Sequence, residues 1–524
     1  MNYNHKKYLH LLLLITFALS ACKKQWDKQT EITDQQLNKS LMQQIQENSN
    51  LSTFAGYLTK LGYDKVLSAS RTYTVWAPDN QALQSVDPAT VADTAKLRLF
   101  ITNHIANQTF LTTAPQPSLR VRMLNGKNVT FTATTVDDVT ITQANQYVNN
   151  GVLHIISQPL TPRLNIFDYI KSLSNVGALQ RQYLQRQDST YVDTSRATVA
   201  SINPATGKPI LVPNTGVVTR NRYFTRVANL SSEDSTYTYF VLTDDAYNAE
   251  RNKVSRFFTT VTNSQDTTMN ILAAYNVLKD VAVRGIVKPA DLPGTLVSVN
   301  GVNIPINKSA IVQTYNASNG IVYVMNSLNF KLEDKITPII IEGERPSFYA
   351  RTDRNSNIFI RARQEPNNGP KFNDIIIRGT DLPASFYAAY KLSNLYTCRY
   401  RVIWRALNDI AFTTGAVDFQ QRLTFGQITA TTVDNGTTVS NPTVTYPYTG
   451  VGYLRYAELE LTGATLATGT STNATINVSG GMLNVTKYAS VNMYAQGSTI
   501  QYTSANADRN AMTLDYVKLI PILQ

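Results

Sequence analysis

An internal repeat constrains the fold of this 524-residue chain more than any other feature of its sequence. Three short segments recur in the same order and at similar separations: residues 74–83 match 238–247, residues 124–126 match 299–301, and residues 150–156 match 319–325. Repetition of several ordered segments at one approximate period is the signature of a duplicated structural unit. The sequence therefore predicts two copies of one module, with loops of different length.

Each copy has the same pattern of local signals. A β-rich run enters a turn at residues 78–80 or 243–245, where short polar side chains can cap the helix that follows. Helical periodicity follows, including residues 97–105 and 269–278, and an Asn-Gly hairpin turn then leads to a final alternating strand. We expect a mixed α/β module in each copy.

These segments resemble the fasciclin domain, an α/β adhesion module. The hallmarks are residues 74–83, the tripeptide Asn103-His104-Ile105, and the strand at residues 150–156. The second copy departs from the family pattern: Tyr275-Asn276-Val277 stands for Asn-His-Ile, Tyr323 replaces the strand histidine, and an insertion covers residues 188–235. The resemblance implies fasciclin-like domains at residues 37–162 and 163–335.

The first residues have the pattern of a signal peptide. Basic residues at positions 5–7 precede an apolar run at residues 11–18, which is too short to span about 30 Å of hydrocarbon. The end of the run, Leu19-Ser20-Ala21-Cys22, resembles the lipobox of bacterial lipoproteins. Residues 1–21 are then removed, and Cys22 becomes the acylated amino terminus; the alternative is an ordinary secretory signal that contains a cysteine.

Residues 22–36 are polar and suit a flexible tether in which Trp26 rests at the membrane interface. No later stretch approaches eighteen apolar residues, so lipid is the expected membrane attachment. Lys23-Lys24 after the cysteine, by analogy with other lipoproteins, favours the outer membrane over the inner. We expect the folded part to face the cell exterior.

The last part of the chain, residues 343–524, has a different residue pattern. Alternating stretches at residues 357–363, 400–404, 453–461 and 514–520 are separated by Gly-, Thr- and Asn-rich turns, and no convincing helix appears. This pattern predicts an antiparallel β-sandwich, and its final strand weakly resembles those of jelly-roll domains. The fold class expected for the whole chain is therefore multidomain α+β.

Charge and motif content limit the chemistry. The formal charge of +12 is dispersed rather than concentrated in a stripe, which disfavours nucleic acid as a ligand and suits anionic lipid or polysaccharide.

His104 and His154 fall on fasciclin hallmark positions, where a structural role is favoured over a base or metal ligand. Cys398 is expected to be a buried inert thiol. Asp244 and Asp245 favour a helix cap over a calcium site. We expect no cofactor, no metal and no enzymatic activity.

Aromatic residues are the remaining lead. Tyr446, Tyr448, Tyr453 and Tyr456 gather beside Gly and Pro, where flat rings can stack on sugars, although tyrosine also fills strands for its β-propensity; Trp404 is expected in the core. The preferred hypothesis is a non-enzymatic surface lipoprotein that binds glycan or serves an outer-membrane complex, similar to accessory lipoproteins of Bacteroidota in glycan import. The alternatives are a purely structural subunit and a glycan-active enzyme whose carboxylates come from Asp374, Asp381, Asp409 and Glu458.

Overall fold

A computed structural model describes residues 35–113, 117–260, 267–350, 355–379, 382, 386–409, 411–412, 415–416, 419–427, 440–466, 475–497 and 511–524. The chain separates into two compact units. The first contains the described chain up to Ser172 with Leu230–Tyr237 and Tyr315–Ile321; the second contains Leu173–Asn229, Thr238–Thr314 and Val322–Gln524. The domain boundaries expected at residues 163, 335 and 343 stay predictions.

A seven-stranded sheet with the order β2-β1-β7-β6-β5-β4-β3 organises the first unit. Its strands β1 (Tyr73–Pro78) and β7 (Gly151–Ile156) run parallel and are mainly apolar. Such near-continuous apolar runs are expected where a strand is covered on both faces. The remaining strands are β2 (Ile105–Ala106), β3 (Leu119–Arg122), β4 (Asn128–Phe131), β5 (Thr135–Val136) and β6 (Val139–Val148).

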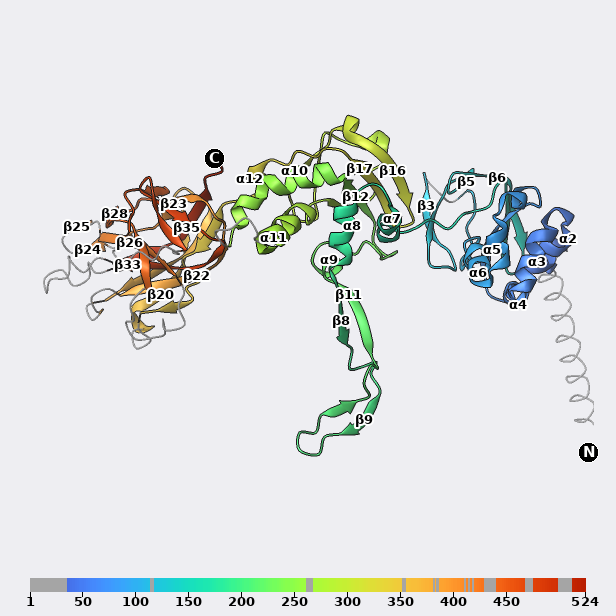
Figure 1. Cartoon of the computed structure of the whole chain (residues 1–524), viewed down its shortest axis with the longest axis horizontal. Helices are drawn as coiled ribbons and strands as arrows, with labels where there is room; N and C mark the ends of the chain where they lie inside the picture. Colours follow the sequence, from blue (N-terminus) through green and yellow to red (C-terminus); the bar gives the residue numbers. More distant parts are fainter. Residues whose placement is uncertain are drawn as a thin grey trace, which may run out of the picture. The chain divides into compact units, whose positions relative to one another are not determined.

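Two apolar clusters cover the opposite faces of this sheet. Val75 and Ala77 belong to one cluster and Trp76 to the other, because successive side chains of a strand point to opposite faces. The first cluster also contains buried residues of the helices that Figure 1 shows gathered together in blue. The helices of this cluster are α2 (Leu41–Glu47), α3 (Ser52–Lys60), α4 (Tyr63–Ser68) and α6 (Thr94–Thr102), whereas α5 (Pro88–Ala92) and α7 (Ile166–Ser172) contribute no residue to it.

Helix α2 illustrates how local sequence starts these helices. Ser40 accepts a hydrogen bond from the Gln43 N–H, and the Gln43 side chain bonds back to the Ser40 N–H, which is a complete capping box. Leu41 and Ile45 then lie four residues apart on one face, and both are fully buried.

The strand order of the first sheet recurs in a four-stranded sheet, β13-β12-β17-β16, and a β14–β15 hairpin corresponds to β3–β4. The strands are β12 (Tyr237–Leu242), β13 (Ala282–Arg284), β14 (Thr295–Val297), β15 (Asn303–Pro305), β16 (Ile311–Ala317) and β17 (Gly320–Met325). The helices of this part are α8 (Ala178–Gln185), α9 (Arg222–Arg226), α10 (Asp244–Ser255), α11 (Thr267–Leu278) and α12 (Leu332–Lys335).

The insertion that the sequence predicts is largely a ribbon, which we call the arm and define as residues 188–221. Two antiparallel strand pairs build it, β8 (Asp188–Val192) with β11 (Val217–Asn221) and β9 (Val199–Ile202) with β10 (Pro209–Leu211). Figure 1 shows the arm extending away from α8 and α9.

Residues 339–521 form antiparallel sheets around one shared apolar cluster. A six-stranded sheet contains β23 and β35, a seven-stranded sheet contains β22, β26 and β33, and a three-stranded sheet has the order β20-β21-β34. The main strands are β18 (Ile339–Glu342), β20 (Ile358–Gln364), β21 (Lys371–Arg378), β22 (Tyr387–Leu395), β23 (Arg399–Arg405), β26 (Phe419–Gln427), β27 (Ser440–Thr445), β32 (Met482–Val485), β33 (Ala489–Gly497), β34 (Ala511–Leu514) and β35 (Tyr516–Pro521). Shorter strands are β19 (Phe348–Tyr349), β24 (Ala411–Phe412), β25 (Gly415–Ala416), β28 (Thr449–Val451), β29 (Leu459–Leu461), β30 (Thr465–Leu466) and β31 (Ile476–Ser479).

Two expectations about local structure were wrong. Residues 453–461 were expected to form one strand, but only β29 at the end of that range is a strand. Leu454 has a left-handed backbone (φ 53°), which no regular strand accommodates. The helix expected at residues 97–105 is α6, and it ends at Thr102, because Ile105 pairs instead with β1.

Candidate functional sites

Asn150, before β7, is a buried hydrogen-bonding centre of the first repeat. Its side-chain oxygen accepts the N–H of Leu41 (2.7 Å), and its amide donates to the carbonyls of Leu67 and Ala69 (both 2.8 Å). One side chain thus ties the start of α2 and the end of α4 to the strand. Because all three amide contacts are used inside the protein, this residue is structural.

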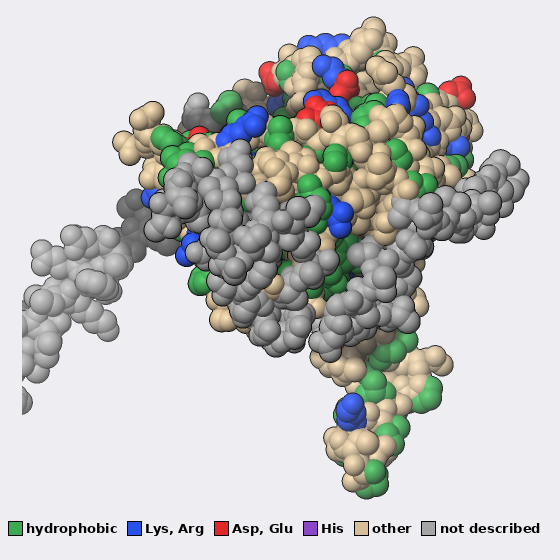
Figure 2. Space-filling view, turned by 90° about the vertical axis from the view of Figure 1, so that its left-hand side faces the viewer, with side chains coloured by type: hydrophobic (Ala, Val, Ile, Leu, Met, Phe, Trp, Pro, Cys, Tyr) green, Lys and Arg blue, Asp and Glu red, His purple; other side chains and the backbone are tan. Residues whose placement is uncertain are grey.

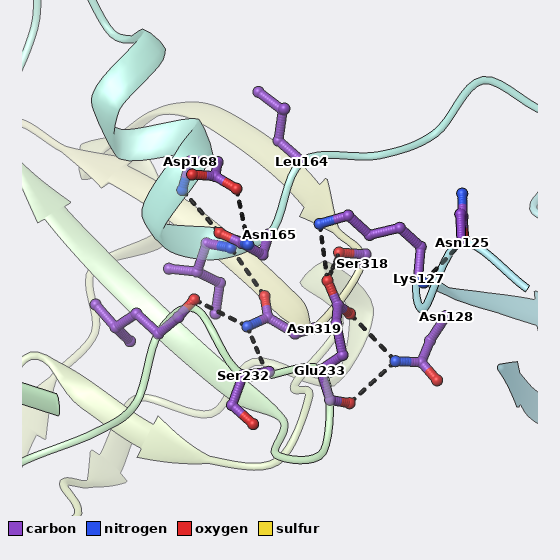
Figure 3. Close-up of polar contacts among 12 residues, drawn as sticks. Asn125, Lys127, Asn128, Leu164, Asn165, Asp168, Ser232, Glu233, Ser318 and Asn319 are labelled. Atoms are coloured by element: carbon purple, nitrogen blue, oxygen red, sulfur yellow. Dashed lines mark hydrogen bonds and ion pairs between the residues drawn. The ribbon is translucent and has the colours of Figure 1, made fainter. Parts of the chain in front are cut away.

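Asn319, before β17, repeats the arrangement of Asn150. It accepts the N–H of Ile166 (2.8 Å) and donates to the carbonyls of Leu230 and Ser232 (both 2.9 Å). Figure 3 shows this side chain among its partners. Asn150 and Asn319, which are equivalent in the sequence repeat, therefore also make equivalent hydrogen bonds.

The glycine after each asparagine has the same steric reason in both repeats. Gly151 and Gly320 have positive φ, and an added Cβ would lie 1.9 Å from the carbonyl oxygen of Tyr73 or 2.0 Å from that of Tyr237. No residue with a side chain fits such a close backbone approach. The Asn-Gly pair is thus required by the fold.

The turn after the first strand of each repeat also matches. Asn80 accepts the N–H of Thr53 (2.9 Å), and Asp244 accepts the N–H of Leu179 (2.9 Å). Thr243 caps α10 through its hydroxyl. Asp244 is therefore engaged in linking helix ends, in keeping with the structural interpretation rather than with a calcium site.

His154 and Tyr323 occupy equivalent positions and perform the same task. The His154 Nε2 contacts the Phe110 carbonyl (2.9 Å), and the Tyr323 hydroxyl donates to the Val287 carbonyl (2.7 Å). His154 also stacks on Trp76, with ring centroids 5.7 Å apart. Tyrosine replaces histidine in the second repeat because each can donate one hydrogen bond from the end of a flat ring.

His104 is fully buried and has both ring nitrogens engaged. Nδ1 contacts the Phe100 carbonyl (2.9 Å) and Nε2 accepts the N–H of Leu160 (2.9 Å), so the ring is the neutral Nδ1–H tautomer. Burial lowers the pKa of His104 to about 4. This histidine has no free nitrogen for a substrate or metal.

The position equivalent to His104 in the second repeat is Val281. The backbone N–H of Trp76 in β1 donates to the His104 carbonyl (2.9 Å), and the backbone N–H of Phe240 in β12 donates to the Val281 carbonyl (2.9 Å). The prediction that residues 275–277 stand in this place is therefore wrong. The shared asparagine suggested it, but those residues lie within helix α11.

Asp280 consequently stands where Asn103 stands in the first repeat. Asn125 donates to Asn103 (2.7 Å), and Asn300 donates to Asp280 (3.1 Å). The second repeat compensates the added charge with Lys335, which forms a fully buried ion pair with Asp280. Burial lowers the pKa of Lys335 to about 8.

A polar cluster around Glu233 lies within the first unit (Figure 3). The Glu233 carboxylate accepts from Lys127 Nζ (2.9 Å), Asn128 Nδ2 (3.1 Å) and Ser318 Oγ (2.7 Å). Arg120 donates to the backbone carbonyls of Glu233 and Ser318. These contacts attach two short loops to the β3–β4 hairpin, and they give each carboxylate oxygen of Glu233 at least one donor.

Tyr446 cannot belong to an exposed platform, so its assignment as a ligand-binding residue was wrong. Its side chain is 0% exposed, its hydroxyl accepts the N–H of Leu483 (3.1 Å), and its ring lies edge-on to Phe425. It directly follows strand β27 and belongs to the shared apolar cluster, where tyrosine fills apolar space and keeps one polar atom hydrogen-bonded.

The other three tyrosines lie in separate environments. The Tyr448 ring lies under the Arg422 guanidinium at 4.6 Å. Tyr453 is 37% exposed, and Tyr456 meets Phe372 edge to face with centroids 6.4 Å apart. Of the four residues, Tyr453 and Tyr456 are the better placed for a ligand.

The carboxylates considered for catalysis are engaged by cations or hydroxyls. Arg361 binds Asp374 through two nitrogens (2.5 and 2.8 Å) and Asp409 through a third (2.7 Å). Glu458 accepts from a tyrosine hydroxyl, which lowers its pKa. Asp381 lies outside the described residues.

A cluster that sequence reasoning missed surrounds Phe372, and we call it the Phe372 cluster. It contains Phe372, Tyr456, Arg405, Glu365 and Asp515. Arg405 lies over the Phe372 ring (4.3 Å) and reaches Glu365 (2.8 Å) and Asp515 (3.2 Å). Burial and neighbouring carboxylates raise the pKa of Asp515 to about 7. Partly exposed aromatic rings beside charged groups suit a ligand rich in hydroxyls.

Two further observations concern metal ligands and the thiol in the described part of the chain. No group of three His, Cys, Asp or Glu side chains there could hold a metal ion, and no helix there is long and apolar enough to cross a membrane. Burial raises the pKa of Cys398 to about 11, which keeps the thiol protonated.

The geometry defines a mixed α/β multidomain protein. Residues 49–162 match the fasciclin domain family, so this segment is a fasciclin domain. A solved FAS1 domain pair from the insect cell adhesion molecule fasciclin I is 14% identical, and the match covers 55% of this chain and 100% of that chain at a TM-score of 0.22. A comparison with curated proteins finds no match.

Proposed function

We propose that this chain is a lipid-anchored, non-enzymatic binding protein with two fasciclin-like domains followed by a jelly-roll-like β-sandwich. The observation that carries the proposal is the fasciclin match at residues 49–162, because fasciclin domains are adhesion-type domains. The engagement of both described histidines in structural hydrogen bonds adds support for binding over catalysis.

The second fasciclin-like domain is supported by its bonding. Asn319 reproduces three hydrogen bonds of Asn150, Tyr323 reproduces that of His154, and the sheet order is the same. Two unrelated segments would not be expected to share both this set of hydrogen bonds and this strand order. The β-sandwich is supported by sheets of six and seven strands that share one core.

The ligand in this proposal is a glycan, bound at the Phe372 cluster and Tyr453. Aromatic faces stack on sugar rings, while guanidinium and carboxylate groups hydrogen-bond to hydroxyls. The cluster offers both kinds of group, with Tyr456 and Phe372 beside Arg405.

The anchor in this proposal is lipid on Cys22, which lies outside the described residues. The expected location is the outer membrane with the folded part facing the exterior, where the protein serves a complex such as a glycan importer. Several acyl chains hold a protein stably, since each buried CH₂ contributes about 0.8 kcal/mol.

The test measures retention of the full chain on a panel of immobilised polysaccharides. The proposal expects at least one to bind, with Tyr456→Ala weakening the affinity about tenfold. Tyr147→Ala, a change of an exposed tyrosine in the first unit, is the matched control and should leave the affinity unchanged. Equal loss in both variants would contradict the assignment of the site. Absence of any glycan ligand and of any envelope partner would contradict the function.

A further inference from the structure

The arm contributes nothing to the core of the second unit. None of its residues from 189 to 220 is buried. An isolated two-stranded ribbon is at best marginally stable in water, and the first repeat folds around equivalent contacts without such an insertion. We therefore expect the arm to have a role other than stabilising the second unit.

The outer part of the arm exposes β-branched apolar side chains. Val199 is 50% exposed, Ile202 58% and Ile210 47%. Figure 2 shows the arm as the projection at the bottom of the view, with apolar side chains on its surface. Contiguous exposed apolar groups on a projecting element mark a surface that another molecule covers.

The two edges of the β9–β10 ribbon differ in what they can bind. The Asn203 N–H donates to the Lys208 carbonyl (2.9 Å), so in the next pair, Ile202 and Pro209, the backbone groups point outward. Pro209 has no N–H, which blocks the outer edge of β10. Ile202 keeps its outward N–H, and β9 has no further strand partner among the described residues.

Charge and backbone chemistry select the occupant. Residues 193–216 contain two basic residues, Arg196 and Lys208, and one acidic residue, Asp193, which contacts Arg196 (3.5 Å). This part of the arm therefore has a net charge of +1 (2 − 1), and Lys208 has no ion-pair partner among the described residues. Pairing with the arm of a second copy would bring two such net positive charges together. A lipid interior would leave the outward N–H and C=O groups of β9 without partners, at several kcal/mol each. A protein strand would hydrogen-bond to the outward N–H and C=O groups of β9, and acidic side chains on that strand would complement the positive charge of the arm.

We propose that the outer edge of β9 receives an extended, acidic and partly apolar segment of a different protein by strand addition. The backbone of that segment pairs with β9, and its apolar side chains cover Val199 and Ile202. This binding site is separate from the glycan site proposed for the C-terminal region. The two proposals are independent, so failure of the glycan proposal would not affect this one.

The experiment places a photo-crosslinking amino acid at position 199 of the full chain, in the cells that produce it. Ile202→Pro removes the outward N–H. Val297→Pro is the matched control, because Val297 is 56% exposed and holds the same outward position in the β14–β15 hairpin, beside the Ser298 N–H to Val302 carbonyl bond. A second variant, Lys208→Glu, reverses the charge of the unpaired cation at a residue outside strands β9 and β10.

We expect one adduct with a different protein, whose cross-linked peptide is extended and acidic. Its yield should fall at least tenfold with Ile202→Pro and with the charge reversal, and should not change with Val297→Pro. An adduct between two copies, an adduct with lipid, no adduct, or a yield that neither arm variant lowers would overturn the proposal. Circular dichroism and thermal unfolding of both proline variants should match the parent, because neither residue is buried.

Discussion

Replacing Asn150 by alanine should destabilise the first repeat far more than its size suggests. The change removes three hydrogen bonds, two of them fully buried, and leaves the Leu41 N–H and the Leu67 carbonyl without partners. A net hydrogen bond contributes about 1 kcal/mol, and a buried group left unpaired costs about 1–3 kcal/mol. The free energy of unfolding should therefore fall by about 3–5 kcal/mol.

Urea unfolding followed by tryptophan fluorescence measures this effect for one part of the chain. The chain has three tryptophans, so changing Trp26 and Trp404 to phenylalanine leaves Trp76, which is fully buried beside β7, as the only reporter. Asn149→Ala is the matched control, because its side chain is exposed, and it should change the free energy by no more than about 0.5 kcal/mol. A loss below about 1 kcal/mol for Asn150→Ala would refute the reasoning.

Three further results are expected. Because burial holds the folded pKa of His104 at about 4, below its unfolded value of 6.5, the unfolded state takes up the proton first. The stability reported by Trp76 should thus fall by up to about 3 kcal/mol between pH 6.5 and pH 4, and His104→Gln should remove most of that slope in pH-dependent urea titrations. Lys335→Met should cost about 3–5 kcal/mol in calorimetry by leaving Asp280 uncompensated, and adding Asp280→Asn should recover most of it; a double variant as unstable as the single would contradict this account. Cys22→Ser should move the protein from the membrane to the soluble fraction on cell fractionation, and retention in the membrane would argue against the lipid anchor.

The repeat was predictable because the residues that carry it make irreplaceable backbone contacts. Asn150 with Gly151, and Asn319 with Gly320, survive duplication because only that pair combines a three-way hydrogen bond with a close backbone approach. The alternating run at β23 was predictable for a similar reason, since a strand with one buried face must alternate.

Other features were beyond the sequence because they depend on partners distant along the chain. Asp280 is recognisable as the counterpart of Asn103 only once its contact with Asn300 is seen, which matches the contact of Asn125 with Asn103. The Phe372 cluster joins residues from four separate segments, so the spacing of residues along the sequence does not predict it. Tyr446 was misjudged because exposure depends on the sheet that covers β27, which a single segment does not reveal.

The most direct test of a non-enzymatic binding function incubates the full chain with soluble polysaccharides and measures retention and chain length in the same samples. The account predicts saturable retention of a glycan whose length stays unchanged, with weaker retention by Tyr456→Ala. Shortened glycan whose release disappears with Asp374→Asn or Asp515→Asn would contradict it and favour a glycan-active enzyme.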